Sequence, residues 1–363
     1  MDWLTIVLFV FGLGLLVGGA ELLVRGASSL AAAVGISPLV IGLTVVSFGT
    51  SSPELAVSLQ SAIAGQPALA LGNVVGSNIF NVLFILGVCA LITPLFVQFQ
   101  LIRLDVPLMI VISLILFGLA FDGGLSRFDG LLFVLGLVAY VTFTVVESRR
   151  ANVLDAQTTL TDEVDRSPRG IAIAIGMAVV GLALLVLGAQ WLVDGAISFA
   201  RLFGISELVI GLTIVAVGTS LPEVATSVVA AMRGERDIAV GNVVGSNIFN
   251  ILGILGITAA IAPIHVAPAA IGFDLPVMVA VAIASLPIFF SGQVIARWEG
   301  AVLLGCYFSY VIYLILTASG STAIGPFNLV MLVVLPLTVL LVLTPAVLAL
   351  IRKQPRISDP NQV

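Results

Sequence analysis

The sequence has little charge. Lys, Arg, Asp and Glu make up only 9% of its 363 residues, whereas 60% are hydrophobic. Soluble domains carry about 25% charged residues, so this chain has too little polar surface to cover a soluble globule. No polar stretch is long enough to form a separate soluble domain. Apolar runs instead recur along the whole length, each near the roughly 20 residues that cross a bilayer. The composition therefore predicts a multi-pass membrane protein.

Reactive and metal-ligating side chains are also scarce. The chain has one histidine, His265, and two cysteines, Cys89 and Cys306, which both lie in apolar runs. A buried thiol there behaves as a small hydrophobe, and without a His or Cys cluster no transition-metal site can be drawn. No nucleophile–base pair is apparent. We therefore expect no enzyme activity and no cofactor. The sequence implies the lipid bilayer as its surroundings, no nucleic-acid partner, and no particular protein partner.

Breaks at Gly, Pro and charged clusters predict eleven membrane spans. The first apolar run lacks a basic leader and a small-residue cleavage site, so we expect a retained span and not a cleaved signal. Asp105 and Asp274 each stand two residues before a proline at the start of a span, a pattern that predicts helix caps. The predicted spans are approximately 3–25, 38–64, 69–95, 105–121, 128–147, 170–198, 207–231, 238–261, 273–290, 298–317 and 327–351.

Positive charge predicts how these spans are oriented. Loops on the cytoplasmic side carry an excess of Lys and Arg. With the N-terminus outside, the inner loops and tail hold twelve of the 14 basic residues, and only Arg127 and Arg201 remain outside. We therefore expect a multi-pass protein of the cell membrane with its N-terminus outside and its C-terminus in the cytoplasm.

The sequence repeats itself at an offset of 169 residues. Segment 42–87 aligns with 211–256 without a gap, and 28 of the 46 positions are identical. Each repeat holds five predicted spans, an odd number, so the second copy enters the membrane inverted, as in many secondary transporters. A duplicated helical scaffold is the alternative, but the identity concentrates in polar, helix-breaking segments. We expect an all-α polytopic protein with a first five-helix repeat (1–148), a cytoplasmic linker (149–169), an inverted repeat (170–317), and an extra transmembrane helix with a cytoplasmic tail (318–363).

Each repeat places a glutamate directly after a proline near the middle of a span, at Glu54 and Glu223. Proline inside a helix frees a backbone carbonyl, which persists in lipid only where it lines a cavity or meets a ligand. A glutamate at this depth is costly unless it is paired, and no Arg or Lys lies at matching depth in the predicted spans. Mobile cations are therefore the expected partners. Two protonated glutamates bonded to each other are the alternative.

Neutral oxygens accompany both glutamates. Hydroxyl side chains lie on the same turns, and each repeat continues with the motif GNVVGSNIFN, in which a serine and an asparagine four residues apart share one helical face. Carboxylate, hydroxyl and carbonyl oxygens suit hard ions such as Ca²⁺ and Na⁺. Two carboxylates balance one Ca²⁺ or two Na⁺, and competition between the ions would give counter-transport. Amides and small residues also serve as interhelical contacts in membranes, an alternative that stays open for Asn73, Asn78, Asn242 and Asn247.

The paired GTSxPE and GNVVGSNIFN segments resemble the two alpha repeats of the calcium/cation antiporter superfamily, most closely its prokaryotic sodium/calcium exchangers, over about residues 1–317. The resemblance implies ten core helices, of which the first and sixth slide over a fixed core, and Na⁺/Ca²⁺ exchange by alternating access at a midplane site formed by Glu54 and Glu223. The implied ligands are Thr50, Ser51, Glu54, Ser77 and Asn81 from one repeat and Thr219, Ser220, Glu223, Ser246 and Asn250 from the other, with the carbonyls of Ser47 and Ala216 completing the sodium sites.

Two features depart from the pattern that the resemblance implies. Exchangers that also require potassium typically carry Asp where this chain has Asn250, so Asn250 argues against potassium dependence and leaves two core carboxylates. The apolar run 327–351 adds an eleventh span to the familiar ten. A proton/calcium antiporter of the same superfamily remains an alternative, because two neighbouring glutamates can also bind protons. A cation channel built on the same oxygens is a further alternative.

Overall fold

The computed structural model describes residues 3–155, 167–202 and 216–351. These residues contain nine helices long and apolar enough to cross a membrane, and a tenth span if a bent helix pair is counted as one. Ten of the eleven predicted spans are thereby confirmed. The remaining one, predicted at 207–231, lies partly outside the described residues, which show only its second half. The described part contains only four strands of two residues each, so the all-α fold class is confirmed.

The first half of the chain alternates long helices with short π-helical turns. In chain order its elements are α1 (Trp3–Val34), α2 (Pro38–Ile41), η1 (Gly42–Val46), α3 (Ser47–Thr50), α4 (Ser52–Ile63), α5 (Pro67–Phe80), η2 (Asn81–Ile85), α6 (Leu86–Ile92), β1 (Leu95–Phe96), η3 (Leu101–Asp105), α7 (Val106–Ala120), β2 (Gly124–Leu125) and α8 (Arg127–Asp155). α8 continues past the predicted end of the first repeat at residue 148.

The second half repeats this order. Its described elements are α9 (Pro168–Leu202), α11 (Ala216–Gly218), α12 (Leu221–Met232), α13 (Arg236–Phe249), η5 (Asn250–Leu255), α14 (Gly256–Ile261), β3 (Ile264–His265), η6 (Ala270–Asp274), α15 (Leu275–Phe290), β4 (Val294–Ile295), α16 (Arg297–Ala318) and α17 (Ile324–Ile351).

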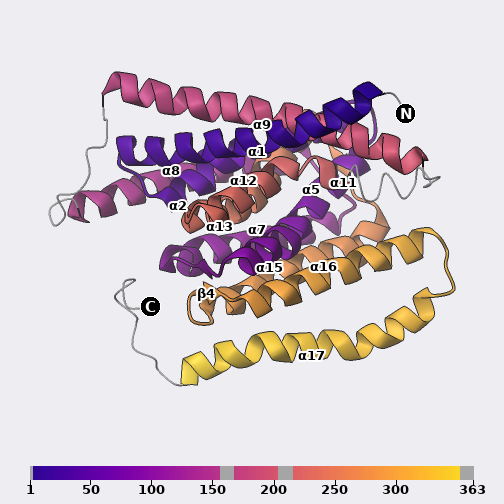
Figure 1. Cartoon of the computed structure of the whole chain (residues 1–363). Coiled ribbons are helices and arrows are strands. Elements are labelled where there is room, and N and C mark those ends of the chain that lie inside the picture. Colours follow the sequence, from indigo (N-terminus) through magenta and orange to yellow (C-terminus); the bar gives the residue numbers. More distant parts are fainter. Residues whose placement is uncertain (1–2, 156–166, 203–215, 352–363) are drawn as a thin grey trace.

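α1 and α9 run side by side along one face of the molecule, and α17 covers the opposite face (Figure 1). Small residues let the first two approach closely. A Cβ added to Gly12 would lie 2.9 Å from the carbonyl oxygen of Gly188, and one added to Gly19 would lie 2.7 Å from that of Gly181. Glycine contacts of this kind permit close backbone packing of membrane helices. The short, broken helices lie between these two faces.

The two halves interlock through reciprocal strand pairs. β1 pairs with β4, with Leu95 opposite Ile295, and β2 pairs with β3, with Leu125 opposite Ile264. Since β1 and β3 occupy matching places in the two repeats, as do β2 and β4, each half supplies the same two strands to the other. Both small sheets are antiparallel and each contains one strand from each half. Neither half therefore completes its own sheet.

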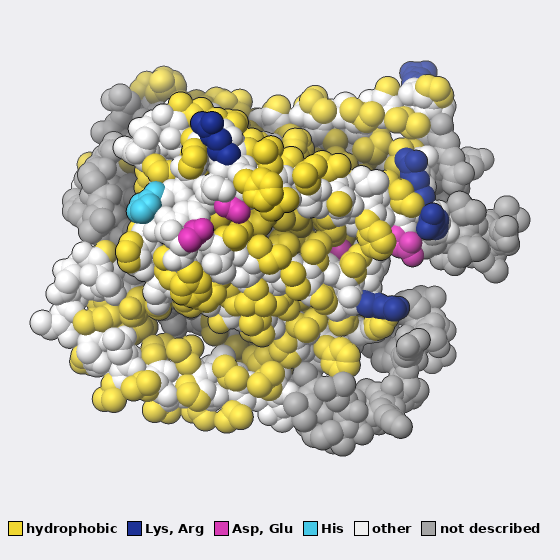
Figure 2. All heavy atoms as spheres, turned by 180° about the vertical axis from the view of Figure 1, so that it is seen from behind, with side chains coloured by type: hydrophobic (Ala, Val, Ile, Leu, Met, Phe, Trp, Pro, Cys, Tyr) yellow, Lys and Arg dark blue, Asp and Glu magenta, His cyan; other side chains and the backbone are white. Residues whose placement is uncertain are grey.

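The outer surface suits a bilayer. Figure 2 shows a face covered mainly by hydrophobic side chains, with few charged groups, which lie toward the ends of the helices. Large apolar side chains on the outer helices, such as Val10, Leu135 and Leu332, are exposed. In water this surface would be unfavourable, whereas in hydrocarbon it needs no cover. The exposed apolar residues are therefore an adaptation to lipid.

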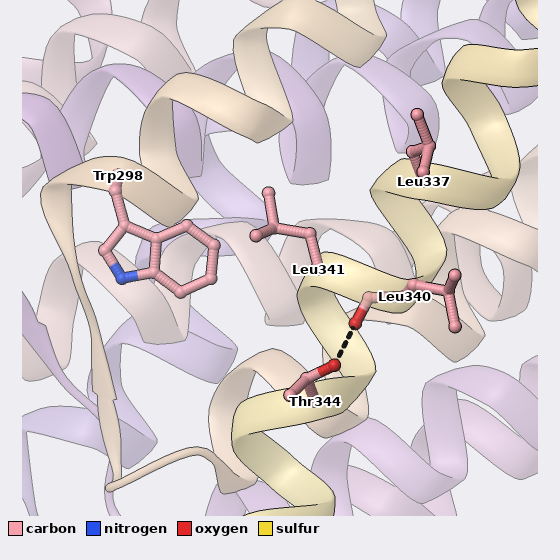
Figure 3. Close-up of a pocket in the computed structure, with 5 residues that line it drawn as sticks. All are labelled: Trp298, Leu337, Leu340, Leu341 and Thr344. Atoms are coloured by element: carbon pink, nitrogen blue, oxygen red, sulfur yellow. Dashed lines mark hydrogen bonds between the residues drawn. The ribbon is translucent and has the colours of Figure 1, made fainter.

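The additional helix α17 packs against α15 and α16 at the edge of the bundle. An apolar cavity of about 1090 Å³ lies between the three helices, which supply most of its lining. Figure 3 shows a smaller pocket of about 370 Å³ nearby, lined by Trp298, Leu337, Leu340, Leu341 and Thr344. The Thr344 hydroxyl donates to the carbonyl oxygen of Leu340 at 2.6 Å. Among the described residues, those that line the two cavities carry no charged side chain.

The predicted helix caps at Asp105 and Asp274 are wrong. Both residues have helical backbone angles and make no side-chain cap bond, because each is the last residue of a π-helical turn, η3 or η6, that continues into α7 or α15. The side chains instead reach the next long helix. Tyr140 donates its hydroxyl to Asp105 at 2.9 Å, and Tyr310 donates to Asp274 at 3.3 Å. The two aspartates thus connect neighbouring helices.

The contact between α8 and α14 provides a test of this packing. A Cβ on Gly130 would lie 2.4 Å from the backbone nitrogen of Ala260, whereas one on Gly136 of the same helix would meet only Leu252, at 3.6 Å. We expect Gly130→Ala to lower the free energy of unfolding by about 1–3 kcal/mol, because backbone must move. Gly136→Ala should leave it unchanged or raise it through the better helix propensity of alanine. Melting temperatures of the detergent-purified variants test this, and equal values would contradict the packing.

Candidate cation-binding site

The second span and its counterpart both break in front of a glutamate. Ser51 and Ser220 have almost the same non-helical angles, φ −83° and ψ 6° against φ −89° and ψ 6°. The helices on either side of Ser51 meet at a bend of 45°. Pro53 and Pro222 follow in the first turn of α4 and α12, where a missing N–H costs nothing. The prolines therefore start new helices within the spans.

Glu54 and Glu223 lie in the first turns of these new helices. Both are buried, with about 1% of each side chain exposed. The N-terminus of a helix carries partial positive charge, which stabilises a carboxylate in the first turn. No Arg or Lys side chain is paired with either glutamate in the described part of the chain. The two acids thus depend on neutral donors in this structure.

Those donors come from the opposite repeat. Ser51 donates its hydroxyl to Oε1 of Glu223 at 2.8 Å, and Ser220 donates to Oε1 of Glu54 at 3.0 Å. The Ser220 hydroxyl also lies 3.2 Å from that of Ser77. Each serine therefore holds the glutamate of the other half. The structure brings both predicted glutamates and three of the predicted serines into one buried cluster.

The two predicted threonines lie beside this cluster, and each donates a hydrogen bond to an asparagine side chain of the opposite repeat. Thr50 donates to Oδ1 of Asn242 at 3.1 Å, and Thr219 donates to Oδ1 of Asn73 at 3.4 Å. The amide groups of Asn73 and Asn242 in turn donate to the backbone carbonyls of Glu54 and Glu223 at 3.2 and 3.5 Å. These contacts fix the threonines next to the turns that carry the glutamates.

Asn81 and Asn250 each open a π-helical turn. η2 begins at Asn81 and η5 at Asn250, directly after α5 and α13. Single π-helical turns inside α-helices occur frequently at functional sites. Asn81 donates its amide to Oδ1 of Asn247 at 3.0 Å, and Asn250 donates to Oδ1 of Asn78 at 2.9 Å. The amide nitrogens are therefore engaged across the repeats.

Five buried oxygens of the predicted ligands have no hydrogen-bond partner among the described residues. Such atoms are rare in folded proteins, because an unsatisfied buried polar group is costly. They belong to both repeats, and each of them can accept a hydrogen bond. They are Oε2 of Glu54, Oε2 of Glu223, Oδ1 of Asn81, Oδ1 of Asn250 and Oγ of Ser246. Acceptors without donors are the arrangement that a hard cation would satisfy.

The backbone ligands fit this cluster less completely. The carbonyl oxygen of Ser47 accepts the amide of Ser51 at 3.0 Å and lies 3.4 Å from the Thr50 hydroxyl, so the break does not leave it free. Its remaining lone pair is what an ion would use. Ala216 begins α11 at the edge of the described residues.

Sequence reasoning missed two serines beside the site. Ser58 and Ser227 are fully buried and accept the amides of Asn73 and Asn242, each at 3.0 Å. The identity of the two repeats at these positions was an available signal. In the described residues no group of three or more His, Cys, Asp or Glu side chains comes together, so only a site with two carboxylates and neutral oxygens can be drawn.

The sequence matches the family described as sodium/calcium exchanger protein over residues 4–146 and 173–316. It is 42% identical over 302 residues to the putative antiporter CaxA of Alkalimonas amylolytica, covering 82% of this chain and 95% of that protein. It is 37% identical to the sodium/calcium exchanger MaX1 of Methanosarcina acetivorans, covering 86% of this chain and 99% of that protein.

A solved structure agrees with these sequence matches. The sodium-calcium exchanger NCX_Mj superposes with a TM-score of 0.74 at 30% sequence identity, covering 88% of this chain and 99% of that one. The match to the family leaves α17 outside, since it ends at residue 316. Both repeats, with the glutamates and the π-helical asparagines, lie within it. The chain therefore belongs to the sodium/calcium exchanger protein family.

Proposed function

We propose that this protein is a secondary active antiporter that exchanges Na⁺ for Ca²⁺ by alternating access at the site of Glu54 and Glu223. Family membership supports a cation antiporter that carries Ca²⁺, and a transporter rather than an enzyme. One observation carries the assignment of the site. Five carboxylate, amide and hydroxyl oxygens from both repeats are buried without a hydrogen-bond partner among the described residues, and the two carboxylates each accept a serine hydroxyl from the opposite repeat.

The charge of the cluster sets how the ions compete. Two carboxylates supply −2, which one Ca²⁺ balances and which three Na⁺ exceed by one. Both ions prefer oxygen ligands, so they would use the same groups in turn. A site that holds either Ca²⁺ or Na⁺, but not both in full, couples their movements in opposite directions. The empty site would leave two buried carboxylates unbalanced, which disfavours crossing the membrane without cargo.

The distribution of basic residues supports an outside N-terminus. Arg233 bonds to Glu21 of α1, which also pairs with Arg25 at 2.7 Å. Arg297 donates to the carbonyl oxygen of Ile92 at 3.4 Å, and Arg236 stacks over Phe96. Arg25 and Arg233 thus share Glu21, while Arg236 and Arg297 begin α13 and α16 beside the segment that follows α6. By the positive-inside rule, the helix ends that carry these arginines face the cytoplasm.

Loss of either carboxylate tests the site. We expect Glu54→Gln and Glu223→Gln each to abolish Ca²⁺ uptake driven by an outward Na⁺ gradient in proteoliposomes, because one remaining charge cannot balance Ca²⁺. Glu147→Gln is the matched control, since Glu147 is exposed on α8 away from the cluster. It should retain wild-type uptake. Near-normal exchange by either site variant would refute the assignment of the glutamates.

The coupling ion has its own test. Vesicles loaded with Na⁺ and diluted into Na⁺-free medium at one pH should accumulate Ca²⁺ above its external concentration, and equal Na⁺ on both sides should stop this. A pH gradient alone should drive no uptake. Uptake driven by the pH gradient without Na⁺ would identify proton coupling instead, and Ca²⁺ flux that never runs uphill would identify a channel.

Cysteine labelling tests the orientation. Gln66, between α4 and α5, and Arg150, near the end of α8, are both exposed. In a background with Cys89→Ser and Cys306→Ser, a membrane-impermeant maleimide should label Gln66→Cys in intact cells. It should label Arg150→Cys only after the cells are permeabilised. The reverse pattern would mean that the N-terminus lies inside.

A further inference from the structure

A second layer of asparagines lies behind the unpartnered amide oxygens. Asn78 and Asn247 occupy the same place in the two repeats and are buried. Each donates its Nδ2 to the backbone carbonyl oxygen of the other, at 3.3 Å from Asn78 and 3.4 Å from Asn247. Each therefore crosses the interface between α5 and α13.

Each of these amide nitrogens also contacts the thioether sulfur of a methionine. Nδ2 of Asn247 lies 3.5 Å from Sδ of Met109, and Nδ2 of Asn78 lies 3.8 Å from Sδ of Met278. Backbone carbonyls and thioethers can only accept hydrogen bonds. An amide flipped by 180° would turn its oxygen toward these acceptors and lose both contacts. The chemistry of the neighbours thus fixes which end of Asn78 and Asn247 is nitrogen and which is oxygen.

The orientation of these two amides determines the orientation of the predicted ligands Asn81 and Asn250. Because Nδ2 of Asn247 donates to the carbonyl oxygen of Asn78, the Oδ1 atom of Asn247 faces Asn81. This oxygen can only accept a hydrogen bond, so Asn81 must turn its Nδ2 toward it, at 3.0 Å. The other end of Asn81 is then its carbonyl oxygen, which is the unpartnered buried atom. Asn78 imposes the same order on Asn250 through the contact at 2.9 Å. Each repeat thereby orients the amide of the other.

We propose that Asn78 and Asn247 are positioning residues for the ion site: each holds the amide of Asn250 or Asn81 so that its oxygen, and not its NH₂ group, faces the cation. The proposal rests on the proposed function, because it treats Asn81 and Asn250 as ligands. A neutral amide attracts a cation through one end and repels it through the other. Groups that orient a metal ligand typically contribute about 10- to 100-fold to metal affinity.

A double-mutant cycle separates orientation from packing. Asn247→Leu keeps the branched shape of the side chain, although it is bulkier, and removes the acceptor that holds Asn81. In the purified full-length protein we expect this change to weaken equilibrium binding of ⁴⁵Ca²⁺ by about 10- to 100-fold. In an Asn81→Asp background the same change should cost little or nothing, because a carboxylate presents oxygen in either orientation. Loss of a purely structural contact would weaken binding equally in both backgrounds.

The mirror pair makes the test independent of one variant's stability. Asn78→Leu alone and combined with Asn250→Asp should behave in the same way, so it carries the test if Asn247→Leu does not fold. Equal losses in the two backgrounds, or no loss from either leucine variant, would overturn the proposal. Glu54→Gln serves as the reference. If it binds Ca²⁺ like the wild type, the proposed site itself is wrong, which is a different result from failure of the asparagine proposal.

Discussion

Two buried carboxylates of like charge, with no basic side chain paired to either in the described residues, are the constraint on which this structure depends. Removing one ionised group from water costs several kcal/mol, and a second one beside it adds repulsion. The protein offsets part of this with the first turns of α4 and α12 and with one serine hydroxyl for each acid. One oxygen of each carboxylate is still left over. A cation is the partner that would remove the remaining cost, which is the physical basis of the proposed transport site.

The site requires both halves of the chain. Ser51 serves Glu223 and Ser220 serves Glu54, so neither repeat alone satisfies its own acid. The strand pairs β1–β4 and β2–β3 show the same exchange at the two ends of the bundle. Such reciprocity means that a movement of one half relative to the other changes equivalent contacts on both. Two similar halves in opposite orientations are the construction of many secondary transporters, and the proposed alternating access would use it.

The sequence predicted the fold class, ten of the eleven spans and two buried glutamates that share one cluster, because each depends on local pattern or on the repeat. It did not predict which hydroxyl serves which acid, since Ser51 and Glu223 are 172 residues apart. The caps expected at Asp105 and Asp274 failed for a related reason. Their partners, Tyr140 and Tyr310, lie one helix further along, and the π-helical turns that end at the two aspartates leave no helix start to cap. Tertiary contacts of this kind leave no periodic signal.

The choice of amides over carboxylates at Asn81 and Asn250 explains why a second layer of asparagines exists. A third or fourth carboxylate would bind cations in any orientation, but it would raise the charge of the site above what one Ca²⁺ balances and add to the cost of burial. An amide supplies an oxygen without charge, and it does so only if its nitrogen is held elsewhere. Asn78 and Asn247 hold the amide nitrogens of Asn250 and Asn81. Their own nitrogens are held by backbone carbonyls and thioethers, which can only accept hydrogen bonds. Keeping the charge at −2 therefore requires a fixed orientation, and the interface between α5 and α13 provides it.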